Sequence, residues 1–109
     1  MTVERAVILG GDEHGLGDAL AAEGVSLTRL AGPTTRDGLR EAGIEEADLL
    51  AVTEATLSTA IPVARELVAD IRVVVYAGDT VPEFVRGQPA LIVDPALMSA
   101  ATVADELVD

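Results

Sequence analysis

The residues with the clearest capacity for chemistry form the turn at residues 10–15 (GGDEHG). This turn follows the apolar run at residues 6–9 and precedes a helical pattern, which is the setting of the phosphate-binding GxGxxG loop. Gly10 and Gly15 match the first and third glycines, but Asp12 replaces the second. A carboxylate at that position would repel a pyrophosphate. The turn therefore predicts the framework of a dinucleotide-binding domain with altered chemistry.

Other polar residues follow two later apolar runs, Thr53-Glu54 after residues 47–52 and Ala-Gly-Asp at residues 77–79. Ligands of parallel α/β sheets bind outside the carboxyl ends of the strands, where the strand order reverses. Backbone N–H groups at the start of a helix also attract anions. We therefore expect a crevice that binds a nucleotide weakly. Its residues would be Gly10, Gly11, Asp12, His14, Gly15, Thr53 and Glu54.

Two sharper kinds of chemistry can be considered for His14, the single histidine. With Asp12 and Asp79 it could hold a divalent cation, because carboxylate and imidazole groups suit such ions. Acidic loops are expected everywhere on this surface, however, and we predict no metal site. With Thr53 or Ser58 as nucleophile His14 could act as a general base, but no residue is evident that would orient it. We assign no catalytic residue and favour a non-catalytic protein.

Charge and composition exclude several classes of protein function. The 109 residues contain 19 Asp and Glu, 7 Arg, no lysine and no cysteine, for a net charge of −12. Disulfides and cysteine nucleophiles are excluded, and nucleic-acid binding is disfavoured. The apolar runs are too short to insert into a membrane and the N-terminus lacks a signal-peptide pattern, so we expect a cytoplasmic protein. The composition resembles that of extreme halophiles, in which salt screens self-repulsion.

Residues 1–109 read as a single domain in which apolar runs alternate with helical patterns. Strict alternation predicts a parallel sheet covered by helices on both faces, a doubly wound three-layer sandwich of Rossmann-like or flavodoxin-like type. The last helix is apolar over a wide arc, which would either pair two copies of the chain or only face the core. Strands are expected at 5–9, 25–30, 47–52, 71–76 and 90–93, and helices at 15–23, around Leu39, from Ser58 or Thr59, at 82–86 and at 96–108.

The segment at residues 32–53 (GPTTRDGLREAGIEEADLLAVT) resembles part of the TrkA-N (RCK) domain, the nucleotide-sensing part of potassium-uptake regulators. The runs at 70–77 (DIRVVVYA) and 91–95 (LIVDP) are similar to later strands of that family. The resemblance implies a Rossmann-like ligand-sensing module with a transporter partner and a homodimer formed through late helices.

The resemblance fails before residue 32, where the chain has room for one strand rather than two. The strand that carries the ribose-binding acid is missing, and Arg29 stands in its place. We therefore expect no NAD binding in the usual mode and leave the cofactor open. We expect Arg29 to form a local ion pair rather than to meet a 2′-phosphate. Loss of the edge strand predicts the order 2-1-3-4-5 for the five-stranded parallel sheet.

Response-regulator receivers share that order and resemble the chain in the acidic pair Asp12-Glu13. Thr53-Glu54 and Asp94 stand where a receiver needs its phosphoacceptor and its lysine, so only a degenerate receiver is compatible with the sequence. Short haloarchaeal chains similar to this one are sometimes labelled CTP synthetase, but that enzyme needs a cysteine and lysines, which this chain lacks, so the residues do not support the activity. We therefore expect a non-catalytic regulatory or ligand-sensing module, with an interaction domain that has an empty crevice and a small enzyme of unrecognised chemistry as alternatives.

Overall fold

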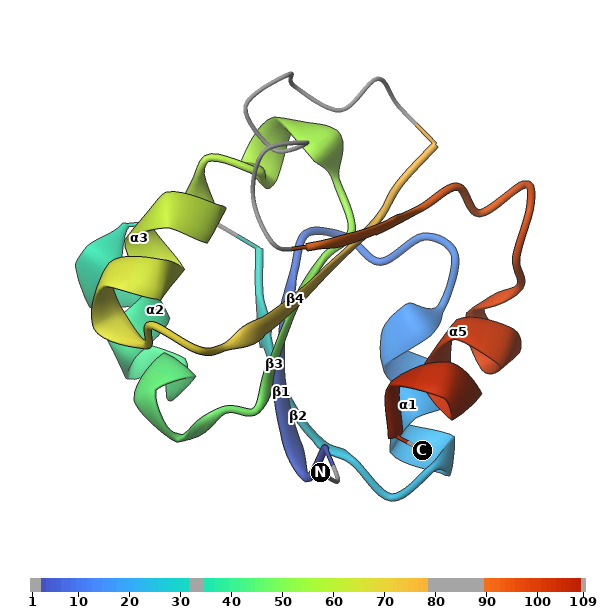
Figure 1. The fold of residues 1–109 in the computed structure, drawn as a ribbon, viewed down its shortest axis with the longest axis horizontal. Coiled ribbons are helices and arrows are strands. Elements are labelled where there is room, and N and C mark those ends of the chain that lie inside the picture. Colours follow the sequence, from blue (N-terminus) through green and yellow to red (C-terminus); the bar gives the residue numbers. More distant parts are fainter. Residues whose placement is uncertain (1–2, 32–34, 79–89, 109) are drawn as a thin grey trace.

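The computed structural model describes residues 3–31, 35–78 and 90–108. Five strands form one parallel sheet in the order β2-β1-β3-β4-β5 (Figure 1), which confirms the predicted α/β fold class and strand order. The strands are β1 (Arg5–Leu9), β2 (Ser26–Leu30), β3 (Leu49–Val52), β4 (Arg72–Tyr76) and β5 (Leu91–Val93). The helices are α1 (Leu16–Ala22), α2 (Arg36–Glu41), α3 (Ala60–Leu67) and α5 (Ala100–Val108), with the 3₁₀ turns η1 (Ile44–Glu46) and η2 (Ala55–Leu57).

The sheet separates two apolar cores, with α2 and α3 on one face and α1 and α5 on the other (Figure 1). Successive strand residues point to opposite faces, so Val7 and Leu9 join the first core while Ala6 and Ile8 join the second. β3 is buried along its whole length, as its uninterrupted apolar sequence predicts. β2 is exposed or half-buried throughout, because it is an edge strand. The sequence patterns of β2 and β3 thus match their places in the sheet, whereas the apolar β5 lies at an edge.

Some element boundaries differ from the prediction. The last helix begins at Ala100 rather than residue 96, because Asp94 first organises a turn. Asp94 Oδ1 accepts a 2.9 Å hydrogen bond from Ala96 N, and the Asp94 carbonyl accepts one from Leu97 N. The turns η1 and η2 were not expected. The predicted helix at 82–86 lies outside the described residues.

The apolar arc of α5 is used inside the domain. Val103, Ala104 and Leu107 are buried in the second core, whereas the exposed positions of the helix include Asp105 and Glu106. Leu97, which we expected within this helix, precedes it and is 82% exposed. The apolar residues of α5 that could have formed a dimer contact are thus used in the core. The homodimer through α5 stays a prediction. Across the described ranges, no helix has the length and apolar character needed to cross a membrane.

Candidate functional site

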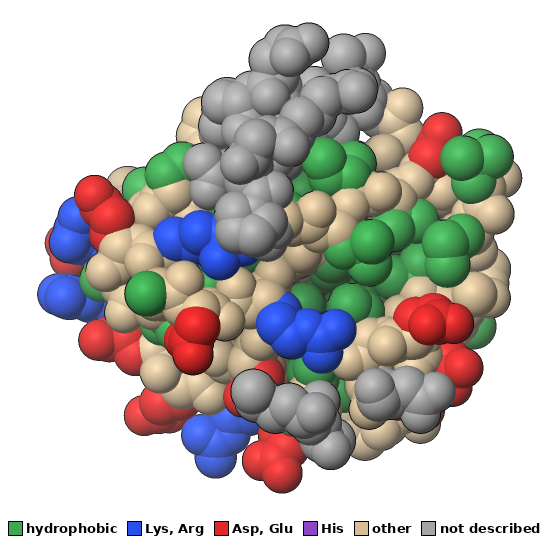
Figure 2. Space-filling view, viewed as in Figure 1, with side chains coloured by type: hydrophobic (Ala, Val, Ile, Leu, Met, Phe, Trp, Pro, Cys, Tyr) green, Lys and Arg blue, Asp and Glu red, His purple; other side chains and the backbone are tan. Residues whose placement is uncertain are grey.

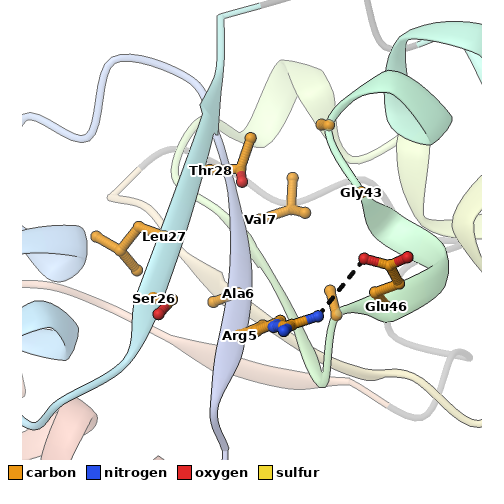
Figure 3. Close-up of a pocket in the computed structure, with 10 residues that line it drawn as sticks. Arg5, Ala6, Val7, Ser26, Leu27, Thr28, Gly43 and Glu46 are labelled. Atoms are coloured by element: carbon orange, nitrogen blue, oxygen red, sulfur yellow. Dashed lines mark hydrogen bonds and ion pairs between the residues drawn. The ribbon is translucent and has the colours of Figure 1, made fainter.

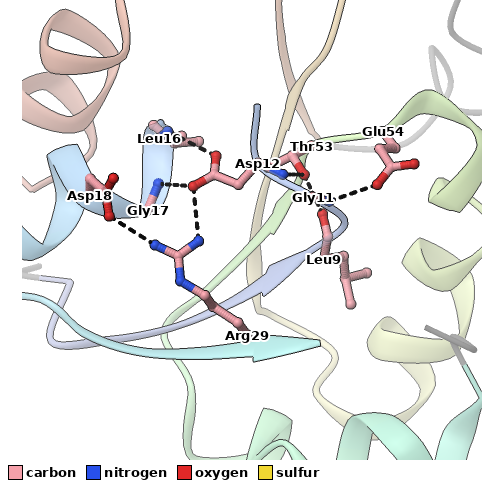
Figure 4. A network of polar contacts seen from close by, with 9 residues as sticks. All are labelled: Leu9, Gly11, Asp12, Leu16, Gly17, Asp18, Arg29, Thr53 and Glu54. Carbon is pink, nitrogen blue, oxygen red and sulfur yellow. Dashed lines mark hydrogen bonds and ion pairs between the residues drawn. The ribbon is translucent and has the colours of Figure 1, made fainter. Parts of the chain in front are cut away.

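The turn at residues 10–15 and the residues after β3 lie together at the carboxyl end of the sheet (Figure 4). Gly11 N donates a 2.7 Å hydrogen bond to Glu54 Oε2, and Asp12 N donates a 3.1 Å bond to Thr53 Oγ1. The structure therefore joins residues that the sequence placed in one crevice, although they are more than 40 residues apart in the chain.

The Asp12 side chain is buried and folds over the start of helix α1, the place where a phosphate would approach. Its backbone adopts a left-handed conformation with φ 52°, and its side chain is buried. Oδ1 accepts a 2.9 Å hydrogen bond from Leu16 N, and Oδ2 accepts a 2.8 Å bond from Gly17 N. These N–H groups begin helix α1, where a negative charge is favoured. The carboxylate thus occupies the start of the helix, and the expected repulsion of a pyrophosphate by Asp12 stays a prediction.

Arg29 completes the surroundings of this carboxylate. Arg29 Nη1 lies 3.1 Å from Asp12 Oδ2, and Nη2 lies 3.1 Å from Asp18 Oδ1. The prediction of a local ion pair for Arg29 is confirmed. Its side chain is 47% exposed, so solvent screens the pair and its contribution to stability is modest. The positive charge at the end of β2 is thus already engaged by two carboxylates.

Thr53 fixes the end of β3 to the end of β1. Its hydroxyl donates a 2.6 Å hydrogen bond to the Leu9 carbonyl while accepting from Asp12 N. Position 10 requires glycine for two reasons. Its φ is 100°, and a Cβ added there would lie 2.6 Å from Thr53 Oγ1. A Cβ at Gly17 would lie 2.7 Å from Arg29 Nη2 and 2.8 Å from Asp12 Oδ2. Sequence reasoning missed Gly17; the spacing of two glycines at the start of α1 was the available signal.

His14 lies against Tyr76, a residue that the sequence analysis did not place in the site. Their ring centroids are 6.0 Å apart in an edge-on arrangement, and His14 Nε2 is 3.5 Å from Glu13 Oε1. The Tyr76 hydroxyl donates a 2.6 Å hydrogen bond to the Met98 carbonyl. Burial raises the pKa of Tyr76 above its ordinary value, and the charge of Asp12 adds to this effect.

The arrangement does not assemble the two kinds of chemistry considered for His14. No described contact joins His14 to Thr53, whose proton is directed to Leu9, or to Ser58, whose buried Oγ has no hydrogen-bond partner. Asp79 lies outside the described residues. Both Asp12 oxygens already accept hydrogen bonds, and the described residues contain no group of three His, Asp or Glu that could hold a metal ion.

Two hollows of the surface bear on ligand binding. A hollow of about 290 Å³ at the site is lined by Gly11, Asp12, Glu13 and Glu54, so three of its four lining residues are acidic. Such a lining disfavours an anionic ligand.

The other hollow, of about 340 Å³, lies between β1, β2 and η1 (Figure 3). An ion pair of 3.5 Å between Arg5 Nη1 and Glu46 Oε2 crosses one end of it. Apart from this pair and the hydroxyls of Ser26 and Thr28, the lining consists of small or apolar residues. Arg5 and Glu46 are paired with each other, so Ser26 and Thr28 supply the other polar side chains that could orient a ligand there.

Comparison with solved structures supports the fold. A crystal structure from Burkholderia pseudomallei, described as that of a "Putative pilus assembly-related protein", is similar with a TM-score of 0.65 and 15% sequence identity. The match covers 95% of this chain and 86% of that chain, and at this identity it shows the fold alone. No curated protein matches this sequence. The model of a family of unknown function, DUF7126, matches residues 6–107. The chain therefore belongs to the family DUF7126.

Proposed function

We propose that this chain is a non-catalytic regulatory module that acts by contacting another protein. The observation that supports this most directly is that its own carboxylates fill the strand-end turn. Asp12 accepts the N–H groups of Leu16 and Gly17, and Glu54 accepts that of Gly11. Among Rossmann-like proteins, such N–H groups hold the phosphates of a nucleotide. Because these donors are already hydrogen-bonded and the adjacent hollow is lined by acidic residues, the crevice is poorly suited to bind an anion.

The ligand-sensing alternative, implied by the resemblance to TrkA-N domains, stays a prediction. A nucleotide would have to displace Asp12 or Glu54 from backbone donors and enter a hollow lined by carboxylates. Molar salt would screen the repulsion but would not free the donors. A transporter partner, a halophilic origin and a cytoplasmic location likewise stay predictions. We favour the interaction module because it requires no rearrangement of the turn.

A thermal-shift panel tests the proposal. The full chain is melted in molar KCl with NAD, NADP, ATP, ADP, AMP, cyclic dinucleotides and Mg²⁺, each added separately. A ligand present at a hundred times its Kd would add about 2.7 kcal/mol to the free energy of unfolding, which such a melt detects readily. We expect no shift with any of them. A reproducible increase in Tm with one nucleotide would overturn the interaction proposal in favour of ligand sensing.

The variant Glu54→Gln sharpens the panel. A glutamine still offers an oxygen to Gly11 N but removes one negative charge from the hollow. If charge alone kept nucleotides out, this variant would gain binding that the wild type lacks. We expect it to remain unresponsive, because Asp12 still occupies the start of α1.

A further inference from the structure

The exposed apolar side chains of this protein are concentrated at one place. Among the described residues, the large hydrophobic side chains that are exposed are Leu91 (48%), Ile92 (39%) and Leu97 (82%). All three belong to β5 and the turn that follows it, within seven consecutive residues. We call Leu91, Ile92 and Leu97 the β5 patch. Figure 2 shows hydrophobic side chains gathered on this side of the molecule, over the region between β5 and α5.

The β5 patch is built on a sheet edge. β5 is the last strand of the described sheet and pairs only with β4, so its other edge has no strand partner there. Leu91 pairs in register with Val74 and Ile92 with Val75, which belong to opposite cores, so the edge presents one large apolar side chain on each face. The strand has three residues, none of them charged or proline, and Asp94 and Pro95 follow it directly.

The neighbourhood of the strand is shaped to receive a side chain. A hollow of about 390 Å³ lies beside β5, lined by Leu91, Ala90, Val73, Leu107 and Arg72. Arg72 Nη1 donates a 2.9 Å hydrogen bond to the Leu107 carbonyl, which ties the strand β4 to the end of α5. Leu97 is held outward by the hydrogen-bonded turn that starts at Asp94. The exposed leucines are thus fixed in place rather than carried on a free loop.

Charge indicates which partner would fit. Acidic side chains lie close to the patch in sequence and fold: Asp94 directly follows β5, and Asp105 and Glu106 occupy the exposed side of α5. The described arginines are directed to acceptors within the chain. These contacts are Arg5 with Glu46, Arg29 with Asp12 and Asp18, Arg36 with Glu66, Arg40 with Glu45, Arg65 with the Ile71 carbonyl, and Arg72 with the Leu107 carbonyl. Arg72 lines the hollow and keeps its charge, because its partner is a neutral carbonyl, but Asp94, Asp105 and Glu106 outnumber this one cation, within a chain of net charge −12.

We propose that the β5 patch binds an extended segment of another protein that alternates apolar residues and carries lysine or arginine at its ends. The segment adds as a strand to β5, so that main-chain hydrogen bonds give affinity and apolar side chains enter the hollow beside Leu91. Its basic ends face Asp94 and the acidic residues of α5. A second copy of the chain fits less well, because it would bring another net charge of −12 and the same acidic side chains. This inference rests on the proposed interaction function and names its surface and partner chemistry.

Two synthetic peptides, KVTVTVK and EVTVTVE, test the proposal. Each is titrated into the ¹⁵N-labelled full chain at the lowest KCl concentration at which circular dichroism shows the native helix content. We expect the basic peptide to bind at least tenfold more tightly than the acidic one. The amide shifts should be concentrated at Leu91, Ile92 and Val93. Equal affinity for both peptides, no binding of the basic one, or shifts centred on β2 would overturn the proposal.

Matched variants locate the contact. Leu91→Thr introduces a β-branched residue that suits a strand but removes apolar surface, and Leu97→Ala alters a side chain outside any helix or strand. We expect each to weaken binding of the basic peptide at least fivefold. Leu27→Thr makes the same exchange in the opposite edge strand β2 and should leave binding within twofold of the wild type. Equal weakening by Leu27→Thr would contradict the assignment to β5.

Sedimentation velocity separates the partner from a second copy. We expect Leu91→Thr and Leu97→Ala to leave the oligomeric state of the chain unchanged. A dimer that Leu91→Thr or Leu97→Ala dissolves would assign the patch to self-association and overturn the proposed partner. Failure of the peptides, with the nucleotide panel still negative, would remove this inference and leave the interaction function in place. A nucleotide-induced rise in Tm would overturn that function whatever the peptides do.

Discussion

Asp12 Oδ2 accepts a 2.8 Å hydrogen bond from Gly17 N, which lies at the start of helix α1, directly after the turn that contains Asp12. A backbone donor that could face a ligand is thereby satisfied by a side chain five residues away. The contact links the fold to the proposed function, because the same carboxylate both stabilises α1 and closes the crevice. Changes at Asp12 should consequently be felt first in stability.

Asp12→Ala should lower the free energy of unfolding by about 2–3 kcal/mol, because two helix N–H groups lose a charged acceptor in a buried setting. Urea unfolding at constant KCl measures the difference. Asp18→Asn is the matched control: it removes the exposed partner of the other Arg29 nitrogen and should scarcely move the midpoint. Similar midpoints for Asp12→Ala and the wild type would contradict the role given to Asp12.

Gly10→Ala should destabilise the protein more than Gly24→Ala. Both glycines have positive φ, 100° and 91°, so both substitutions carry a backbone cost of about 1–2 kcal/mol. A Cβ at Gly10 would also lie 2.6 Å from Thr53 Oγ1, whereas a Cβ at Gly24 meets nothing within 4 Å. The steric contact should add roughly 1–3 kcal/mol at Gly10 alone. Thermal melts of the two variants, compared side by side, measure the difference; equal losses would show that the turn can move to accept the extra atom.

Tyr76 gives a direct optical test of the site. It is the single tyrosine of a chain without tryptophan, so absorbance near 295 nm follows its ionisation alone. The pKa of Tyr76 is raised by burial and by Asp12, so the native protein should titrate at a higher pH than the urea-unfolded chain. Since the unfolded state releases this proton first, the stabilising contribution is complete below the ordinary pKa of about 10 and declines as pH rises above it. Coincident titration curves for native and unfolded protein would contradict the burial of this hydroxyl.

Salt should stabilise the protein. A net charge of −12 on 109 residues generates self-repulsion that is stronger in the compact state than in the unfolded chain. Raising KCl from about 0.1 to 1 M shortens the screening length from roughly 10 to 3 Å. We expect the urea midpoint to rise over this range and NaCl to act similarly. A midpoint that falls with salt would mean that the ion pairs around Arg29 and its neighbours outweigh the net repulsion.

Much of the fold could be predicted from the sequence because its signals are local. The run at residues 5–9 is β1, and the alternating pattern of β2 correctly indicated an edge strand. The strand order followed from the single strand between the glycine turn and residue 32. The boundary of α5 was less accessible, because the Asp94 turn competes with a helix that the apolar pattern alone would start earlier.

The site was predicted in its location but not in its chemistry. Which residues meet at the strand ends depends on topology, and the alternation of strands and helices along the chain was enough to predict it. The inward direction of Asp12 depends on a left-handed backbone at one residue and on Arg29, which approaches from a strand 17 residues later. The contact of His14 with Tyr76 depends on how β4 and the turn pack together. Such relationships arise only from the assembled tertiary structure.

The strand order also has a consequence for how the chain folds. The first strand lies inside the sheet, and Arg5 N donates to Asp48 Oδ2, 43 residues away, so its environment is complete only after a large part of the chain is available. Parallel neighbours cannot be joined by a hairpin, which leaves few short-range contacts to guide early assembly. We therefore expect this domain to refold more slowly than a helical bundle of the same length.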